Sequence, residues 1–307
     1  MAKYFTSLLC LLLTLSSVLL ARERTVPELL ILADSLAAAA NFDSAIAVER
    51  RALDLAVEQN GMVDSTVAKI LVYLGSEHLS LGRYAESERF LLQALEIREK
   101  VLGQDHLKTG HCWNNLGVLY NNTGRYDEAE RAYRKTLSIY ENAAGTDPLY
   151  IIRTLNNLAG NTWLQGKYDL AGQFGERALA MSETSLGANH PEVAGILNNL
   201  GSIYGDKGDF KKAEAAFERA LSILEQSRGR NSRTIARILN NLANIYADLS
   251  KYDQAEEMFL KAIRLKKSIF GDTHPDVAMS QNGLAAIYLK TGRDHLAEPL
   301  LEKVLAI

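Results

Sequence analysis

The sequence predicts an all-α fold built as an array of seven tandem helix-turn-helix repeats, and three observations lead to this prediction. A short phrase recurs every 42 residues, apolar residues within a copy follow helical spacing, and a glycine-containing turn separates the two apolar stripes. A fixed period of this length is typical of repeat proteins. The array accounts for nearly all of the 307 residues.

The period is clearest in the phrase Leu-Asn-Asn-Leu-Ala and its close variants. Its second leucine recurs without a slip, and the period extends backwards by two more copies to give Leu32, Leu74, Leu116, Leu158, Leu200, Leu242 and Leu284. An aromatic column keeps the same phase at Phe42, Tyr84, Tyr126, Tyr168, Phe210 and Tyr252. A small-residue column does so at Ala45, Ser87, Ala129, Ala171, Ala213, Ala255 and Ala297. Several columns in phase over most of the chain exclude a chance origin.

Each copy has the spacing of two helices. In one clear repeat, Leu116 and Tyr120 belong to a first apolar stripe, and Ala129 and Tyr133 belong to a second. Gly124 lies between the stripes, where a helix would end. A single hairpin cannot bury its apolar stripe alone, so neighbouring hairpins are expected to stack into a continuous core.

Taken together, these columns resemble the tetratricopeptide repeat. Trp113 fills a position where that family often has tryptophan. The 42-residue period and the Leu-Asn-Asn-Leu phrase resemble the kinesin light chain type, which is also widespread in bacteria. The resemblance covers residues 26–307 and implies a right-handed α-solenoid whose concave face is lined by the first helix of each repeat. It says much less about function, because this fold hosts many partners.

By this resemblance, the first asparagine of each pair faces a peptide-binding groove, as a row of Asn114, Asn156, Asn198, Asn240 and Asn282. A carboxamide both donates and accepts hydrogen bonds, so it can pair with a peptide backbone of any sequence. The same face is expected to carry His111, Asn121, Arg153, Trp163, Arg237, Asn244 and Asp248. The arginines could take a carboxylate from the partner, and the tryptophan could anchor it. In the alternative interpretation, both asparagine columns only hydrogen-bond the adjacent repeats.

Other classes of chemistry lack their sequence signals. The formal net charge is −3, which does not favour nucleic acid. His106, His190 and His274 occupy equivalent positions two periods apart, so stacked repeats would keep them from sharing a metal ion. The sequence has no phosphate-binding glycine loop, nucleophile elbow or zinc-protease motif. We therefore expect no catalytic residues, no cofactor and no metal site.

The first 21 residues resemble a secretory signal peptide. Lys3 precedes an apolar run from Leu8 to Leu20, and Ala21 precedes a charged segment. We expect cleavage near Ala21, an array over residues 22–307, and a secreted or periplasmic protein. The alternative is an uncleaved membrane anchor, although the run is short for a spanning helix. Cleavage would leave Cys112 as the single cysteine, and we expect it to be a buried, inert thiol.

The two ends of the array differ. Glu49 stands where other repeats carry Tyr133 or Phe217, which we interpret as a worn terminal repeat that faces water. The seventh repeat stops at Ile307, inside its second helix, without the polar cap that repeat arrays need. We expect either self-association through this end or a natural protein that continues beyond it.

The sequence thus predicts a scaffold that holds a peptide or protein partner in its concave groove. An alternative of another class comes from bacterial relatives, which often join such arrays to signalling or caspase-like domains. In that case the chain would be the sensory or regulatory arm of a larger effector protein.

Overall fold

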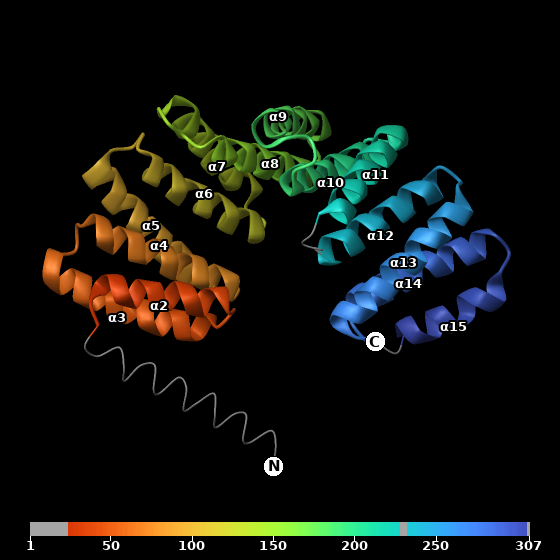
Figure 1. Cartoon of the computed structure of the whole chain (residues 1–307), viewed down its shortest axis with the longest axis horizontal. Helices are drawn as coiled ribbons and strands as arrows, with labels where there is room; N and C mark the ends of the chain where they lie inside the picture. Colours follow the sequence, from red (N-terminus) through yellow and green to blue (C-terminus); the bar gives the residue numbers. More distant parts are fainter. Residues whose placement is uncertain (1–23, 228–231, 306–307) are drawn as a thin grey trace, which may run out of the picture. The chain divides into compact units, whose positions relative to one another are not determined.

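The computed structural model describes residues 24–227 and 232–305, all of whose regular elements are α-helices (Figure 1). The helices are α2 Val26–Ala38, α3 Phe42–Asn60, α4 Ser65–Ser80, α5 Tyr84–Leu102, α6 Leu107–Asn122, α7 Tyr126–Asn142, α8 Pro148–Leu164, α9 Tyr168–Leu186, α10 Pro191–Asp206, α11 Phe210–Gln226, α12 Ser232–Asp248, α13 Tyr252–Phe270, α14 Pro275–Lys290 and α15 Asp294–Leu305. Successive helices pair into seven hairpins, from α2/α3 to α14/α15. The predicted all-α array of seven helix-turn-helix repeats is therefore confirmed.

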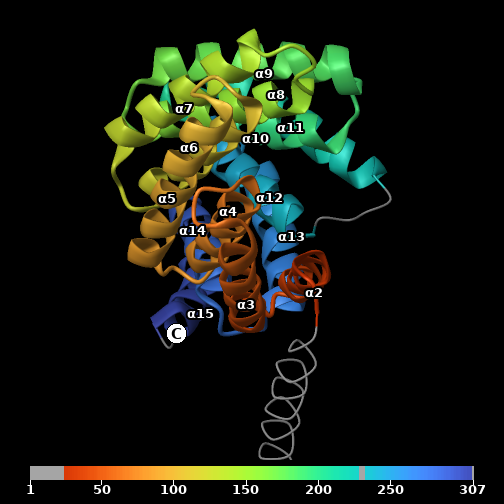
Figure 2. The ribbon, with the colours of Figure 1, turned by 90° about the vertical axis from the view of Figure 1, so that its left-hand side faces the viewer.

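The chain divides into two compact units. Unit 1 is Met1–Thr146 and contains α2 to α7, and unit 2 is Asp147–Ile307 and contains α8 to α15. Within each unit, the second helix of a hairpin packs against the first helix of the next, as can be followed by colour in Figure 2. The proposed signal peptide at residues 1–21 lies outside the described residues. None of the described helices is long and apolar enough to cross a membrane.

Every hairpin tip contains one residue with positive φ. These residues recur every 42 positions, as Ala40 (57°), Gly82 (70°), Gly124 (75°), Gly166 (72°), Gly208 (84°), Ser250 (58°) and Gly292 (70°). Glycine adopts this left-handed conformation without the steric cost that a Cβ brings. Two of the seven tips therefore place a side chain where the fold favours glycine.

The linker histidines cap helices. Nδ1 of His106, His190 and His274 each accepts a hydrogen bond of 3.1 Å from the backbone N–H two residues later. Asp64 and Asp147 do the same for α4 and α8. A side-chain acceptor at this position satisfies an N–H group that has no partner within the helix. The periodic histidines are thus explained by helix capping.

Within three hairpins, α6/α7, α8/α9 and α10/α11, the sizes of two facing residues are complementary. A Cβ added to Gly201 of α10 would lie 2.7 Å from the ring of Phe217 in α11, and one on Gly117 would lie 2.6 Å from the ring of Tyr133. In α8/α9 the order is reversed, with Ala159 facing Gly175, and Leu200 of the next hairpin packs where a side chain on Gly175 would lie. The two helices of each of these three hairpins are therefore matched to one another in volume.

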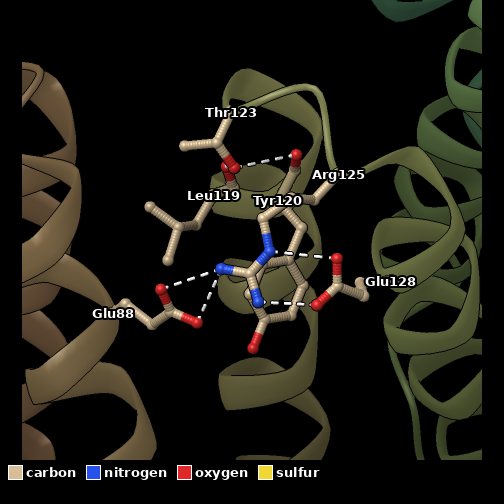
Figure 3. Close-up of polar contacts among 6 residues, drawn as sticks. All are labelled: Glu88, Leu119, Tyr120, Thr123, Arg125 and Glu128. Atoms are coloured by element: carbon tan, nitrogen blue, oxygen red, sulfur yellow. Dashed lines mark hydrogen bonds and ion pairs between the residues drawn. The ribbon is translucent and has the colours of Figure 1, made fainter.

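Neighbouring hairpins are also joined by a cation that lies on a tyrosine ring (Figure 3). The Arg125 guanidinium lies 4.2 Å from the Tyr120 ring centroid. Its Nη1 donates to both oxygens of Glu88 in α5, at 2.8 and 2.9 Å, and its Nε and Nη2 donate to Glu128. This cation clamp recurs in unit 2 as Tyr246, Lys251 and Glu214, and as Tyr288, Arg293 and Glu256.

One junction in unit 2 lacks the clamp. Gly172 stands in the column of Glu214, and Asp209 stands in the column of Lys251. Asp209 instead caps α11 by accepting a hydrogen bond from the backbone N–H of Lys212. The tyrosine of this junction, Tyr204, keeps a hydrogen bond of 2.8 Å to Glu176.

The prediction that Glu49 faces water is wrong. Its side chain is only 1% exposed, and its Oε2 atom has no hydrogen-bond partner in the described part of the chain. Burial raises the pKa of Glu49 to about 8, and the neighbouring carboxylates of Glu77 and Asp34 add to the shift. The carboxyl group is therefore neutral at moderately acidic pH, and ionising it costs folding free energy.

Cys112 is buried, as predicted. It is 0% exposed in α6, and burial raises the pKa of its thiol to about 11. Arg98 from α5 reaches over it and donates to the backbone carbonyl of Lys108 and, at 3.5 Å, to the Cys112 sulfur. A thiol that stays protonated and covered is a poor nucleophile.

Candidate functional site

A cavity of about 900 Å³ lies within unit 2. The first helices α8, α10, α12 and α14 supply most of its lining, and the second helices α11 and α13 close its base through Phe217, Lys266 and Phe270. Half of the predicted groove residues line it, namely Trp163, Asn198, Arg237, Asn240, Asn244 and Asp248. A cavity of this size is in the range of ligand-binding clefts.

One helix, α12, presents a continuous polar stripe to this cavity. Arg233, Arg237, Asn241, Asn244 and Asp248 all line it and follow one another at intervals of three or four residues. This spacing places them on one face of the helix. Since α12 rises about 1.5 Å per residue, the stripe runs for about 22 Å from its first arginine to its aspartate.

Asn240 is held at the base of the cavity by a buried cation. Lys266 of α13 is 6% exposed, and its Nζ donates to Asn240 Oδ1 at 3.3 Å, Ser280 Oγ at 2.7 Å and the backbone carbonyl of Asp276 at 3.1 Å. Ser280 Oγ also donates to Asn240 Oδ1, at 2.6 Å. These contacts fix the amide oxygen, which leaves the NH₂ group of Asn240 as its available donor.

The Lys266 ammonium has no carboxylate among its hydrogen-bond partners in the described residues. Burial lowers the pKa of Lys266 below its ordinary value, while the charge of Asp276 acts in the opposite direction. A desolvated cation without a paired anion leaves positive potential in the part of the cavity beside Lys266.

Other asparagines bond to one another, one pair between α8 and α10 and one pair within α10. Asn199 Nδ2 donates to Asn156 Oδ1 at 2.9 Å, and Asn198 Nδ2 donates to Asn199 Oδ1 at 3.3 Å. Asn198 is 3% exposed, and its Oδ1 atom is buried without a partner among the described residues. Asn240 is 8% exposed. Asn156 and Asn240 thus hydrogen-bond the neighbouring first helix, which was the alternative interpretation of this column, whereas the bond of Asn198 stays within α10.

Trp163 and the carboxylate of Asp206 both line the cavity. Trp163 Nε1 donates to Asp206 Oδ2 at 2.7 Å, so the indole ring is held at the C-terminal end of α10. Arg153 lies outside the cavity lining, and its Nε pairs with Glu192 at 3.0 Å. Its expected role in taking a partner carboxylate would require it to exchange that bond.

The remaining predicted groove residues lie elsewhere. Asn282 is exposed on α14 but does not line the cavity. His111, Asn114 and Asn121 lie on α6 of unit 1, and all three are partly buried. The His111 ring stands edge-on to Tyr140 at 5.7 Å, and burial lowers the pKa of His111. A binding role for these four residues stays a prediction.

Comparison with known proteins settles the family. Residues 66–142, 150–226 and 234–307 match the sequence pattern of the tetratricopeptide repeat. The chain belongs to the tetratricopeptide repeat family. A search among curated proteins finds no match to its sequence. The family assignment confirms the repeat type predicted from the leucine, aromatic and small-residue columns.

Solved structures resemble this tetratricopeptide array in fold. BtubC (BKLC) from P. vanneervenii is 24% identical, with a TM-score of 0.63 over 73% of this chain and 88% of its own. The tetratricopeptide-like repeats of a kinesin light chain-like protein from Podosopora anserina are 21% identical, with a TM-score of 0.56 over 66% of this chain and 95% of their own. A signal transduction ATPase with a tetratricopeptide repeat sensor, from Pyrococcus horikoshii, is 19% identical, with a TM-score of 0.72 over 91% of this chain and 41% of its own. These likenesses show the fold alone.

Sequence reasoning missed several lining residues of the tetratricopeptide array. Asn199 and Asn241, the second asparagines of their pairs, line the cavity, as do Lys266 and Phe270 of α13. A signal for Lys266 was present, because its column holds Ala56, Tyr140, Ser182 and Leu224 in other repeats and one other cation, Arg98. The described residues contain no group of three His, Cys, Asp or Glu side chains able to hold a metal ion.

Proposed function

We propose that this protein is an interaction scaffold that binds an extended segment of a partner polypeptide in the cavity of unit 2. Tetratricopeptide arrays generally bind protein partners, and the observation that carries the proposal for this chain is the cavity itself. Its volume is about 900 Å³, and its lining combines amide groups with the aromatic side chains of Trp163 and Phe270. Amides that can pair with a peptide backbone, beside aromatic anchors, are suited to an unfolded segment.

The exposed members of the lining are the contacts most available to a partner. Asn244 and Asp248 are exposed, and Asn241 is half-buried. Asn198 and Asn240 contribute less directly, since both residues are buried. In this proposal the partner is recognised by the polar stripe of α12, together with Trp163 from α8. The predicted row of five first asparagines is not required.

Fluorescence of Trp163 tests the proposal. The chain has two tryptophans, and the Nε1 atom of Trp113 is buried without a hydrogen-bond partner in the described residues. Trp113→Phe therefore loses no hydrogen bond and leaves Trp163 as the single reporter. Peptides selected from a random library displayed against the protein would be synthesised and titrated, and we expect a saturable change in Trp163 emission.

Two arginine substitutions supply the matched comparison. Asn244→Arg places a long side chain in the cavity, whereas Asn282→Arg makes the same change on an exposed face outside it. We expect the first variant to lose peptide binding and the second to keep it. Equal binding by both variants, or equal loss, would remove the cavity from the proposal.

Two finer expectations remain as proposals. Secretion rests on the sequence pattern of residues 1–21, and N-terminal sequencing of the mature protein would test it. The second candidate, a sensory arm of a larger effector, is supported by fold resemblance alone. An effector role would require peptide binding to change the activity of an attached domain.

A further inference from the structure

The cavity of unit 2 is electrically polarised along α12. Arg233 and Arg237 lie in the first half of the helix, and Lys266 reaches the same end from α13. Asp248 is the last residue of α12, and Asp206 is the last residue of the neighbouring α10. Cationic side chains therefore line one end of the cavity, and carboxylates line the other.

Among the described residues, the charges at each end have few partners of opposite sign. Arg237, Asp248 and Arg233 form no ion pair with any described residue, and the Arg233 guanidinium lies 5.3 Å from the Phe270 ring centroid. In the described part of the chain, the hydrogen-bond partners of Lys266 are all neutral oxygens. One carboxylate, that of Asp276, also lines the cationic end, where it lies 3.9 Å from His274 Nδ1. Among the described lining residues, three cations against one carboxylate leave this end positive.

The helix dipoles act in the same direction as the side chains. The cationic end contains the N-termini of α12 and α14, and the acidic end contains the C-termini of α10 and α12. A helix carries partial positive charge at its N-terminus and partial negative charge at its C-terminus. Backbone and side chains thus add to one field that runs along the cavity.

We propose that the cavity selects a bipolar peptide segment, with an acidic group at the Arg237 end and a basic side chain at the Asp248 end. This inference rests on the proposed function and names the partner chemistry of the same site. The NH₂ group of Asn240 and the cations together suit a carboxylate. At the other end, a basic side chain would meet two carboxylates and the face of Trp163, which attracts cations.

The length of α12 sets the separation of the two groups. Arg237 and Asp248 are 11 residues apart, or about 16 Å along the helix. From Arg233 the distance is about 22 Å. An extended peptide advances about 3.3 Å per residue, so the acidic and basic residues of the partner should lie about five to seven positions apart.

Charge reversal at each end tests the two halves separately. Arg237→Glu introduces a carboxylate near a helix N-terminus, and Asp248→Lys introduces a cation at a helix C-terminus, so neither reversal opposes the helix dipole. Both side chains are exposed, which leaves the core intact. Random 12-residue peptides would be selected against the wild type and both variants, and representative peptides would be titrated against Trp163 emission.

We expect wild-type selection to enrich peptides with one acidic and one basic residue at the stated separation. Arg237→Glu should abolish the preference for the acidic residue and keep the preference for the basic residue. Asp248→Lys should abolish the preference for the basic residue and keep the preference for the acidic one. Neutralising either peptide charge should weaken wild-type binding up to about tenfold, and added salt should reduce the difference.

The outcomes separate this inference from the proposed function. Peptides that depend on the cavity, as shown by loss with Asn244→Arg, but carry no charge pattern would overturn the bipolar inference and leave the scaffold proposal standing. A pattern of acidic residues only, or of basic residues only, would also overturn it. If no selected peptide depends on the cavity, both proposals fail.

Discussion

Two glycine-to-alanine substitutions in unit 2 should shift stability in opposite directions. Gly201 and Gly172 both lie inside helices, where alanine is favoured over glycine by about 1 kcal/mol. Around Gly172, nothing lies within 4 Å of the added Cβ. At Gly201, the Cβ would lie 2.7 Å from Cε1 and Cζ of Phe217, which is 1% exposed. The sign at Gly201 therefore depends on how far that ring can move.

The magnitude follows from the geometry. To reach an ordinary contact of 3.4 Å, the Phe217 ring must retreat by about 0.7 Å into a packed core. Overpacking of this kind costs about 1–3 kcal/mol. Gly172→Ala should thus gain about 1 kcal/mol of unfolding free energy, and Gly201→Ala should lose up to about 2 kcal/mol. The gain in helix propensity from glycine to alanine is common to both variants. The difference between their changes in unfolding free energy therefore measures the cost of displacing the Phe217 ring.

Urea titration followed by far-ultraviolet circular dichroism would measure both variants, with the slope of the transition checked for constancy. In a Phe217→Ala background the steric cost disappears, and Gly201→Ala should become stabilising. If Gly201→Ala in the wild-type background were as stabilising as Gly172→Ala, the close packing of that hairpin would not limit it, and the volume-matching argument would be wrong.

Three further predictions concern other features of the fold. Ser250→Gly should stabilise the protein by about 1 kcal/mol in urea titration, because it relieves a side chain at positive φ, whereas Gly208→Ala at the equivalent tip should destabilise it. The raised pKa of Glu49 implies that the contribution of this one group to stability is fully present below about pH 4.3, where the carboxyl is protonated in both states, and is lost as pH rises towards the folded pKa of about 8, by at most about 1.4 kcal/mol per pH unit. Thermal unfolding across this range should show the fall, and Glu49→Gln should flatten it. A double-mutant cycle of Arg125→Met and Glu88→Gln should give a coupling of about 0.5–1 kcal/mol that weakens with salt, since both side chains are partly exposed.

Each of these predictions has an outcome that contradicts it. A Ser250→Gly variant no more stable than wild type would mean that the tip carries no strain. A pH profile unchanged by Glu49→Gln would assign the dependence to other groups, such as Glu77, whose pKa is also raised by burial. A coupling of zero between Arg125 and Glu88 would make their ion pair a surface contact without energetic weight.

The repeat architecture could be predicted because it depends on many weak signals in phase. Leucine, aromatic and small-residue columns each repeat in most copies, so an exception such as Glu49 does not disturb the period. The burial of Glu49 was not predictable in the same way. Its column is apolar in other repeats, and polarity alone suggested solvent, but packing by α2 and α4 encloses the site.

The candidate site was predicted only in part. The resemblance to the repeat family predicted that Arg237, Asn244 and Asp248 share the groove face, and all three line the cavity. The sequence could not show which asparagine side chains form hydrogen bonds with other residues of the protein. The hydrogen bond between Asn156 and Asn199 crosses from one repeat to the next, and the contact between Lys266 and Asn240 depends on a side chain from another helix.

The volume matching within hairpins has a consequence for how such a chain can be rearranged. Gly201 of α10 makes room for Phe217 of α11, and Ala159 of α8 faces Gly175 of α9, so neither first helix fits the partner of the other. Exchanging single helices between repeats would create voids or clashes, so the transferable module is the whole hairpin. At one junction the module is larger, because the Phe259 ring of α13 occupies the space beside Gly283 of α14. Recombination or design that respects these boundaries should yield folded arrays, and cuts inside a hairpin should not.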